Sequence, residues 1–325
     1  MQSLGIVEGY YGGLYSFTDR RSLISSLSES QLNSYFYAPK EDPFLRSNFH
    51  LHQSESWRSE FKDFVQLASE KSIEIAVGLT PCSKQHIELI EEKIGYFNEL
   101  GCNKIALLFD DLDQFKVDEQ LQALNIARSA FPGVAFLFCP TVYAEELIGK
   151  DSQHTTYFHE FLKNCPSGIE ILWTGENVIS TNLNFDSDSA LVGLPSEKIA
   201  IWDNYFTVDS RPKRLSLTNF NHLDLSYLKT KTNYFVNLTG MERTDKLIID
   251  IFGNLLSSSG TQFTNILQRH GVPDALIEMI DLFDPEIKIK LLESDKEKLH
   301  KIIFSWFHPL KNEWYPYLHN LKNWG

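Results

Sequence analysis

The chain has 325 residues, a hydrophobic fraction of 42% and an aromatic fraction of 13%, which is enough apolar material for a full core and excludes disorder as the dominant state. The length allows one large domain with a smaller one beside it. The net charge of −13, from 43 acidic and 30 basic residues, argues against nucleic acid or an anionic membrane as the main partner.

The four cysteines form no CxxC pair, and no histidine spacing suggests a zinc site, so no metal or cofactor is expected. No apolar run approaches the length of about 18 residues that a membrane-spanning helix needs. The first residues lack the basic and apolar regions of a signal peptide. We therefore expect a soluble, cytoplasmic protein; a chain from which a signal peptide had been removed would present the same sequence.

Eight short β-type runs alternate with stretches of helical periodicity such as 54–72, 83–100 and 119–131. The β-type runs are Leu4–Glu8, Asn33–Ala38, Ile73–Leu79, Lys104–Phe109, Ala135–Cys139, Ile169–Trp173, Lys198–Trp202 and Tyr234–Leu238. Eight such units predict a closed (β/α)₈ barrel, of class α/β. A doubly wound open sheet is the alternative, and the absence of a G-x-G-x-x-G fingerprint and of a Walker A loop weakens it.

The β-type runs stop near residue 240. Four later segments have helical periodicity: Asp245–Leu256, Ala275–Phe283, Pro285–Leu292 and Lys296–Phe307. We therefore expect a barrel over residues 1–240 and a small C-terminal helical region over residues 241–325. The aromatic tail after it is expected to pack against the rest of the chain. A homodimer, if one forms, is expected to use the C-terminal helices.

The fourth predicted strand, Lys104–Phe109, is an apolar run that ends in Asp110 and Asp111. Two neighbouring acids at the end of a buried strand are costly, because like charges repel in a medium of low dielectric constant. One acid of such a pair can carry a proton at neutral pH, which acid/base catalysis requires. A solvated loop and a Mg²⁺ site that includes Asp113 are the alternatives.

Chemistry in a (β/α)₈ barrel takes place at the carboxyl ends of the strands. Acids, amides, phenols, one lysine and two tryptophans follow the predicted strands: Glu8, Lys40, Asp110, Asp111, Tyr143, Trp173, Trp202, Asn204, Asp209 and Asn237. Each alone could be a core or loop residue. Together they suit a sugar, which has an apolar C–H face and a rim of hydroxyls. Two carboxylates among them suggest glycoside chemistry.

Six sequence blocks carry a family resemblance. In chain order they are GIVEGYYG (5–12), LNSYFYAPKED (32–42), ALLFDDLD (106–113), FLFCPTVY (136–143), LWTG (172–175) and IWDN (201–204). With these blocks the chain resembles the family-84 glycoside hydrolases, which are the O-GlcNAcases and their bacterial β-N-acetylglucosaminidase relatives. The resemblance covers essentially the whole predicted barrel.

The resemblance implies removal of terminal β-linked N-acetylglucosamine (GlcNAc) from a glycoprotein, a peptide or a glycan, with retention of configuration. It also implies substrate-assisted catalysis, in which the acetamido oxygen of the substrate attacks C1 and forms an oxazoline. The partner would be such a GlcNAc-bearing molecule, with neither nucleic acid nor a membrane involved. The aglycone stays open between protein O-GlcNAc, a glycan terminus and a glycosaminoglycan fragment.

By position in the family pattern, Asp110 would hold the acetamido N–H and stay charged, and Asp111 would be the general acid and base. Neighbours on a regular strand point to opposite faces, so both acids can face one pocket only where the strand is already breaking into a loop. Asp113 takes no part in this scheme.

The remaining family positions surround the sugar. Tyr143 would lie near the anomeric carbon, and Trp202 would wall the pocket of the acetamido methyl group. The positions that would hold the hydroxyls or shape the pocket backbone are Gly9, Lys40, Asn204, Asp209 and Asn237.

Three departures from the family pattern concern the pocket rim. The residues 13–15 replace the usual Arg-Pro-Trp, Val142 stands where an acid is common, and 80–82 replace a common Ser-Pro-Gly-type turn. None removes a predicted catalytic group. Two alternatives to a glycosidase are a non-catalytic barrel that binds GlcNAc or glycoprotein and a metal-dependent enzyme that uses Asp110, Asp111 and Asp113.

Overall fold

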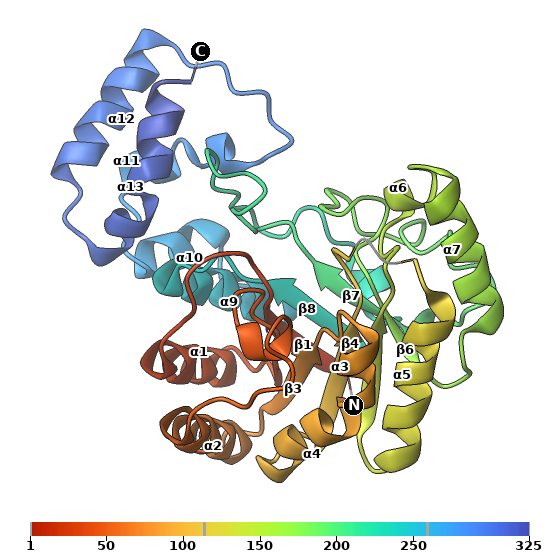
Figure 1. Cartoon of the computed structure of the whole chain (residues 1–325). Helices are drawn as coiled ribbons and strands as arrows, with labels where there is room; N and C mark the ends of the chain where they lie inside the picture. Colours follow the sequence, from red (N-terminus) through yellow and green to blue (C-terminus); the bar gives the residue numbers. More distant parts are fainter. Residues whose placement is uncertain (1, 113–114, 258–259, 325) are drawn as a thin grey trace.

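The computed structural model describes residues 2–112, 115–257 and 260–324. Eight parallel strands close into a barrel in sequential order (Figure 1). They are β1 (Ser3–Glu8), β2 (Ser34–Tyr37), β3 (Glu74–Leu79), β4 (Lys104–Leu108), β5 (Ala135–Cys139), β6 (Glu170–Trp173), β7 (Ile199–Asp203) and β8 (Asn233–Asn237). The predicted (β/α)₈ barrel is confirmed, and each strand end lies within one residue of its predicted position.

Both faces of the strands are buried, which explains the continuous apolar runs in the sequence. In β4, Ala106 and Leu108 belong to the cluster that fills the barrel, whereas Ile105 and Leu107 pack against the surrounding helices. The period-two alternation of a strand produces this division. It also means that the polar residues of the barrel mouth come from the positions where the strands end.

Helices surround the barrel (Figure 1). They are α1 (Phe17–Glu29), α2 (Glu55–Glu70), α3 (Lys84–Glu88), α4 (Ile90–Glu99), α5 (Val117–Ala130), α6 (Glu145–Ile148), α7 (Ser152–Asn164) and α8 (Leu225–Leu228). The apolar stripe of α2 buries Phe61, Phe64, Val65 and Ala68 against the barrel, and the Ser54 hydroxyl caps this helix.

The single helix predicted over residues 83–100 is wrong, because the chain breaks it at Leu89 into α3 and α4. The Leu89 amide bonds back to the His86 carbonyl, a tight turn that ends the first helix. Ile87, Ile90 and Ile94 are nevertheless all buried. The apolar spacing therefore continues across the break, and periodicity alone could not locate it.

The C-terminal region is helical, as predicted. It contains α9 (Glu242–Leu256), α10 (Phe263–Arg269), α11 (Asp274–Ile277), a 3₁₀ turn (Ile280–Phe283), α12 (Glu293–Ser305) and α13 (Pro309–Lys322). Figure 1 shows α12 and α13 together at one side of the barrel. Helix α9 lies against α1, where Ser22 contacts both Glu242 and Lys246. The domain boundary after residue 240 stays a prediction.

The helix predicted over Pro285–Leu292 is wrong. The guanidinium of Arg214 donates to the carbonyls of Asp284, Pro285 and Ile287, so these acceptors are not available to a helix. Ile287 and Leu292 are also exposed, and no buried apolar stripe stabilises a helix here. In the described residues, no helix is both long and apolar enough to cross a membrane.

Candidate active site

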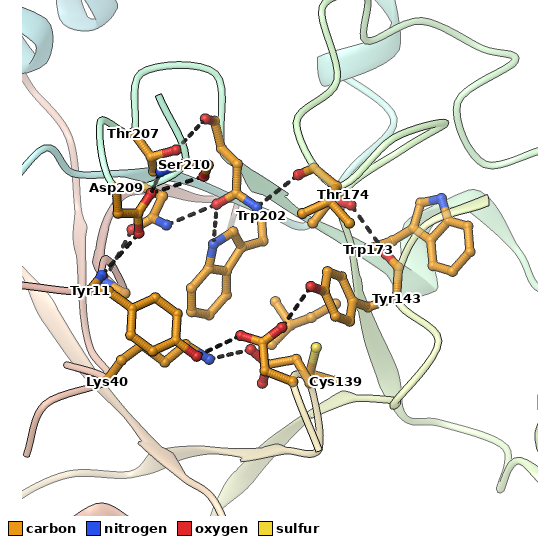
Figure 2. Close-up of a pocket in the computed structure, with 17 residues that line it drawn as sticks. Tyr11, Lys40, Cys139, Tyr143, Trp173, Thr174, Trp202, Thr207, Asp209 and Ser210 are labelled. Atoms are coloured by element: carbon orange, nitrogen blue, oxygen red, sulfur yellow. Dashed lines mark hydrogen bonds and ion pairs between the residues drawn. The ribbon is translucent and has the colours of Figure 1, made fainter. Parts of the chain in front are cut away.

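A pocket of about 370 Å³ opens at the carboxyl ends of the strands (Figure 2). Its volume lies at the lower end of the range for small-molecule sites. The structure brings together in its lining all nine residues that the family pattern assigns to the site: Gly9, Lys40, Asp110, Asp111, Tyr143, Trp202, Asn204, Asp209 and Asn237. They come from the ends of six different strands and the loops that follow.

The two adjacent acids face this pocket because the strand ends before them. β4 ends at Leu108, and Asp111 has a φ of 56°, in the left-handed region that non-glycine residues rarely occupy. The turn breaks the alternation that would otherwise send neighbours to opposite faces. Asp113 lies outside the described residues, so the structure does not place the third acid of the metal-site alternative.

Asp110 is the buried acid of the pair. Its Oδ2 bonds the ammonium of Lys40, which is also buried. Burial opposes the charge of Lys40, but the carboxylates of Asp110 and Asp111 outweigh it and raise the pKa of that ammonium above its usual value. The other oxygen, Oδ1, is buried and has no hydrogen-bond partner among the described residues. An unpaired buried oxygen is costly, so Asp110 has an acceptor available for a ligand.

Asp111 is the exposed acid, and two phenols hold it. The Tyr11 hydroxyl donates to its Oδ2 at 2.8 Å, and the Tyr143 hydroxyl donates to its Oδ1 at 2.9 Å. Burial, together with the nearby charge of Asp111, raises the pKa of Tyr143 far above its usual value. Tyr143 therefore stays a hydrogen-bond donor at any physiological pH. The two acids thus have unlike partners: a cation for Asp110 and neutral donors for Asp111.

One wall of the pocket is a chain of side-chain contacts. The indole Nε1 of Trp202 and the Nδ2 of Asn237 both donate to Asn204 Oδ1, at 2.9 and 2.8 Å. The Gly9 amide donates to Asn237 Oδ1 at 3.1 Å. A Cβ at Gly9 would lie 2.1 Å from a ring carbon of Trp202, so only glycine fits there. This network presents an aromatic surface with amide groups at its edge.

Asp209 lies in the loop that follows β7. Its Oδ1 accepts from the Ser210 amide at 2.7 Å, and its Oδ2 accepts from the Tyr11 amide at 2.9 Å. The carboxylate is half-buried and lines the pocket. Asp209 therefore offers acceptor oxygens to a polar ligand in the pocket, next to Tyr11 (Figure 2).

Trp173, one of the aromatic residues noted at the strand ends, also lines the pocket. The other lining residues were not among the predicted site residues: Tyr11, Cys139, Leu172, Thr174, Val178, Thr207 and Ser210. Tyr11 belongs to the same sequence block as Gly9, and the alternation of β5 points Cys139 into the barrel. The sequence could therefore have indicated both residues. Val178 and Thr207 lie in loops well beyond the strand ends, where no sequence pattern marks them. The Trp173 indole is fully buried and donates to the Ser187 carbonyl, as a core residue does.

The fold and the acid-lined pocket define a (β/α)₈-barrel protein with a site of sugar size at the mouth of the barrel. The model of the β-N-acetylglucosaminidase family matches residues 4–254, and the chain belongs to this family of glycoside hydrolases. The family resemblance of the six sequence blocks is thereby confirmed.

The chain is similar to the Protein O-GlcNAcases of Mus musculus and Rattus norvegicus, each 27% identical over 235 residues. The matches cover 66% of this chain and 25% of each relative, so they span about a quarter of the relatives' length. Among solved structures, a mutant of the O-GlcNAc hydrolase of Thermobaculum terrenum is similar in fold. Its TM-score is 0.78 at 21% identity, over 98% of this chain and 81% of that one.

Proposed function

We propose that the pocket removes terminal β-linked GlcNAc from a glycoprotein, peptide or glycan, with retention of configuration, through an oxazoline intermediate formed by the substrate itself. The observation that carries this proposal is the unequal environment of Asp110 and Asp111. One acid is buried against a lysine, and the other is exposed between two phenols. Acids held in such different surroundings suit different roles in one reaction.

Asp110 is the residue that would bind and orient the acetamido group of the substrate. Its buried, unpaired Oδ1 would accept the acetamido N–H, which orients the acetamido oxygen toward C1. The carboxylate of Asp110, paired with Lys40, would stabilise the positive charge that develops on the forming oxazoline ring. The buried face of Trp202 would receive the methyl group of the acetamide.

Asp111 is the general acid and base of the proposed reaction. In the first step the acetamido oxygen bonds to C1, the glycosidic C–O bond breaks, and the leaving oxygen takes a proton from Asp111. In the second step water bonds to C1, the oxazoline C–O bond breaks, and Asp111 takes a proton from the water. Each step inverts C1, so the configuration is retained. The donor from Tyr143 keeps Asp111 in place throughout.

The rest of the pocket would hold the ring. Asp209, Asn204 and Asn237 present acceptors and donors suited to sugar hydroxyls, while Gly9 leaves room against Trp202. A cavity of about 370 Å³ suits a single terminal sugar and favours action at chain ends. The aglycone would leave through the exposed side, past Asp111 and Tyr11.

The test compares substrates. Turnover of an aryl β-N-acetylglucosaminide establishes the reaction, and GlcNAc-peptide, chitobiose and hyaluronan assayed side by side identify the aglycone class. We expect Asp111→Asn to lose at least about 100-fold in kcat on the GlcNAc-peptide, and less on an aryl substrate that needs little acid assistance. Asp118→Asn, an exposed residue on α5, is the matched control.

A wild-type rate for Asp111→Asn on the GlcNAc-peptide contradicts the assignment of the proton-transferring residue. Binding of GlcNAc without release of any product supports the non-catalytic barrel instead. Assays with and without a chelator test the metal-dependent alternative, since full activity without divalent ions eliminates it.

A further inference from the structure

Tyr11, in the loop between β1 and α1, contacts two acids of the pocket. Its backbone N–H donates to Asp209 and its hydroxyl donates to Asp111 (Figure 2). Tyr11 is 44% exposed, and the two glycines that follow it are exposed as well. Packing at the tip of the loop therefore does not fix the backbone of Tyr11. Arg46 Nη1 donates to the Tyr11 hydroxyl at 3.4 Å, and the base of the loop supplies the further support for its position.

Tyr10 and Tyr15 form that base. Both side chains are buried, and their rings meet edge to face with centroids 5.5 Å apart. The Tyr10 hydroxyl donates to the Gly13 carbonyl at 3.0 Å, which closes the loop on itself. The Tyr10 ring covers Gly240, where an added Cβ would lie 2.7 Å from it. The loop thus rests on the connection between β8 and α9.

Asp245, in the first turn of α9, joins these parts. Its Oδ2 accepts from the Tyr15 hydroxyl, and its Oδ1 accepts from both the amide and the hydroxyl of Thr239, each at 2.8 Å. Asp245 is fully buried. One carboxylate therefore ties the base of the pocket loop to α9 and to the end of β8, although neither Asp245 nor Tyr15 lines the pocket.

The C-terminal helix α13 fixes the same turn of α9. Met241, the residue before α9, supplies no side-chain cap. The carboxylate of Glu313 instead accepts from the amides of Arg243 and Thr244, at 3.0 and 2.8 Å, and the Trp314 indole donates to the Thr244 hydroxyl at 2.9 Å. First-turn amides need acceptors and favour negative charge, so Glu313 acts as a cap supplied by another helix.

We propose that Tyr15 and Asp245 are positioning residues for the hydrolysis, because they hold the β1–α1 loop so that Tyr11 contacts Asp111 and Asp209 together. The inference rests on the proposed function. Tyr15 stands in one of the segments that depart from the family pattern, so this support belongs to this chain in particular. A loosened loop weakens sugar binding through Asp209 and proton transfer through Asp111.

The kinetic test uses Tyr15→Phe, which keeps the ring and removes the hydroxyl that donates to Asp245. On the GlcNAc-peptide we expect kcat/KM to fall about tenfold, with a higher KM, since small misplacements near reacting groups are costly. The loss in kcat should be smaller on the activated aryl substrate. A merely structural role would instead lower kcat equally on both substrates, through a smaller folded fraction, and leave KM unchanged.

Three further variants serve as comparisons. Asp245→Asn is the conservative change: its oxygen can accept from Thr239 and its amide can donate to Tyr15, so activity should stay within about threefold of wild type. Tyr96→Phe removes a buried hydroxyl that has no partner among the described residues, and Asp250→Asn changes an acid farther along α9. Both should leave the kinetic constants unchanged.

Hydrogen exchange of the loop amides tests the inference without turnover. We expect the Tyr11 amide to exchange at least about tenfold faster in Tyr15→Phe than in the wild type or in Tyr96→Phe. A wild-type enzyme that hydrolyses none of the substrates overturns the proposed function, while the exchange result still decides whether Tyr15 holds the loop. Unchanged exchange in Tyr15→Phe, or faster exchange with unchanged kinetics in an active enzyme, overturns the positioning role.

Discussion

Two fully buried aspartates lie on either side of β8, and their surroundings differ. Asp203, at the end of β7, faces His222 Nε2 at 2.8 Å and the Tyr234 hydroxyl at 2.6 Å. Burial opposes its charge, yet these partners outweigh burial and hold the pKa of Asp203 below its usual value. Asp245 has only hydroxyl and amide donors, and burial raises its pKa to about 7.

Burial alone therefore does not decide whether an acid in this protein stays charged; the partner decides. Both acids support the rim of the pocket. Asp203 holds Tyr205 and His222, near the two ends of the loop that carries Asp209, and Asp245 holds the loop that carries Tyr11. The two loops meet where the Tyr11 amide donates to Asp209.

The largest loss of stability at a single pH is expected from Asp203→Asn. The Nδ2 of asparagine in place of Oδ2 would face the donors of both His222 and Tyr234. The imidazole could adapt only by moving its proton to Nδ1, a buried atom without a partner among the described residues. Such a broken buried network costs about 3 kcal/mol, measurable by urea unfolding at pH 7.

Asp245→Asn is the comparison for Asp203→Asn. At Asp245 the Nδ2 of asparagine would face only the Tyr15 hydroxyl, which can rotate to accept, so we expect a smaller loss of stability. A loss of free energy of unfolding as large for Asp245→Asn as for Asp203→Asn would show that burial, and not the partner, governs both sites.

A second prediction concerns pH. Because the pKa of Asp245 rises from 3.8 to about 7 on folding, the native state holds a proton that the unfolded chain releases. The stability from this group is complete below pH 3.8, declines as pH rises from there, and is lost above about pH 7. The carboxyl is faced by Tyr15, Tyr10 and Glu313, none of which is a cation.

The wild type should lose stability relative to Asp245→Asn by on the order of 4 kcal/mol as the pH rises from 4 to 8, measured by urea unfolding. Asp203 has the opposite sign, since its lowered pKa contributes stability above pH 3.8 that is lost as pH falls. If the difference in free energy of unfolding between the wild type and Asp245→Asn did not vary with pH, the raised pKa of Asp245 would be contradicted.

The smallest effect is expected from Glu313→Gln. Glutamine keeps an acceptor for the amides of α9 but loses the charge that favours a helix N-terminus, so we expect a loss of about 0.5 kcal/mol. Glu278→Gln, at an exposed ion pair, is the matched control in the same thermal unfolding experiment. A loss above about 2 kcal/mol would mean that Glu313 does more than cap α9.

The barrel could be predicted because its signals are local. Each strand is a short apolar run that ends at a polar turn, and the site residues follow these ends directly, as Asp110 and Asn204 do. The helix predicted over Pro285–Leu292 does not form for a non-local reason. Arg214, about 70 residues earlier in the chain, donates to the carbonyls of Asp284 and Pro285.

The contacts that hold the pocket loop in place could not be predicted from the sequence either, because they are also non-local. Nothing in the sequence pairs Tyr15 with Asp245 or Glu313 with the first turn of α9, because each contact joins segments far apart in the chain. Tyr11 could have been predicted as a site residue, since it stands two residues after Gly9. Its double contact with Asp111 and Asp209 depends on the closed barrel.

The left-handed backbone of Asp111 limits which substitutions report on chemistry alone. Aspartate and asparagine tolerate a φ of 56°, whereas alanine pays a steric penalty there and a β-branched residue pays more. An alanine variant at this position would mix the loss of a proton donor with a rearranged turn that also moves Asp110. Asparagine is therefore the substitution whose rate measures proton transfer, and a series of side chains at position 111 would instead measure backbone tolerance.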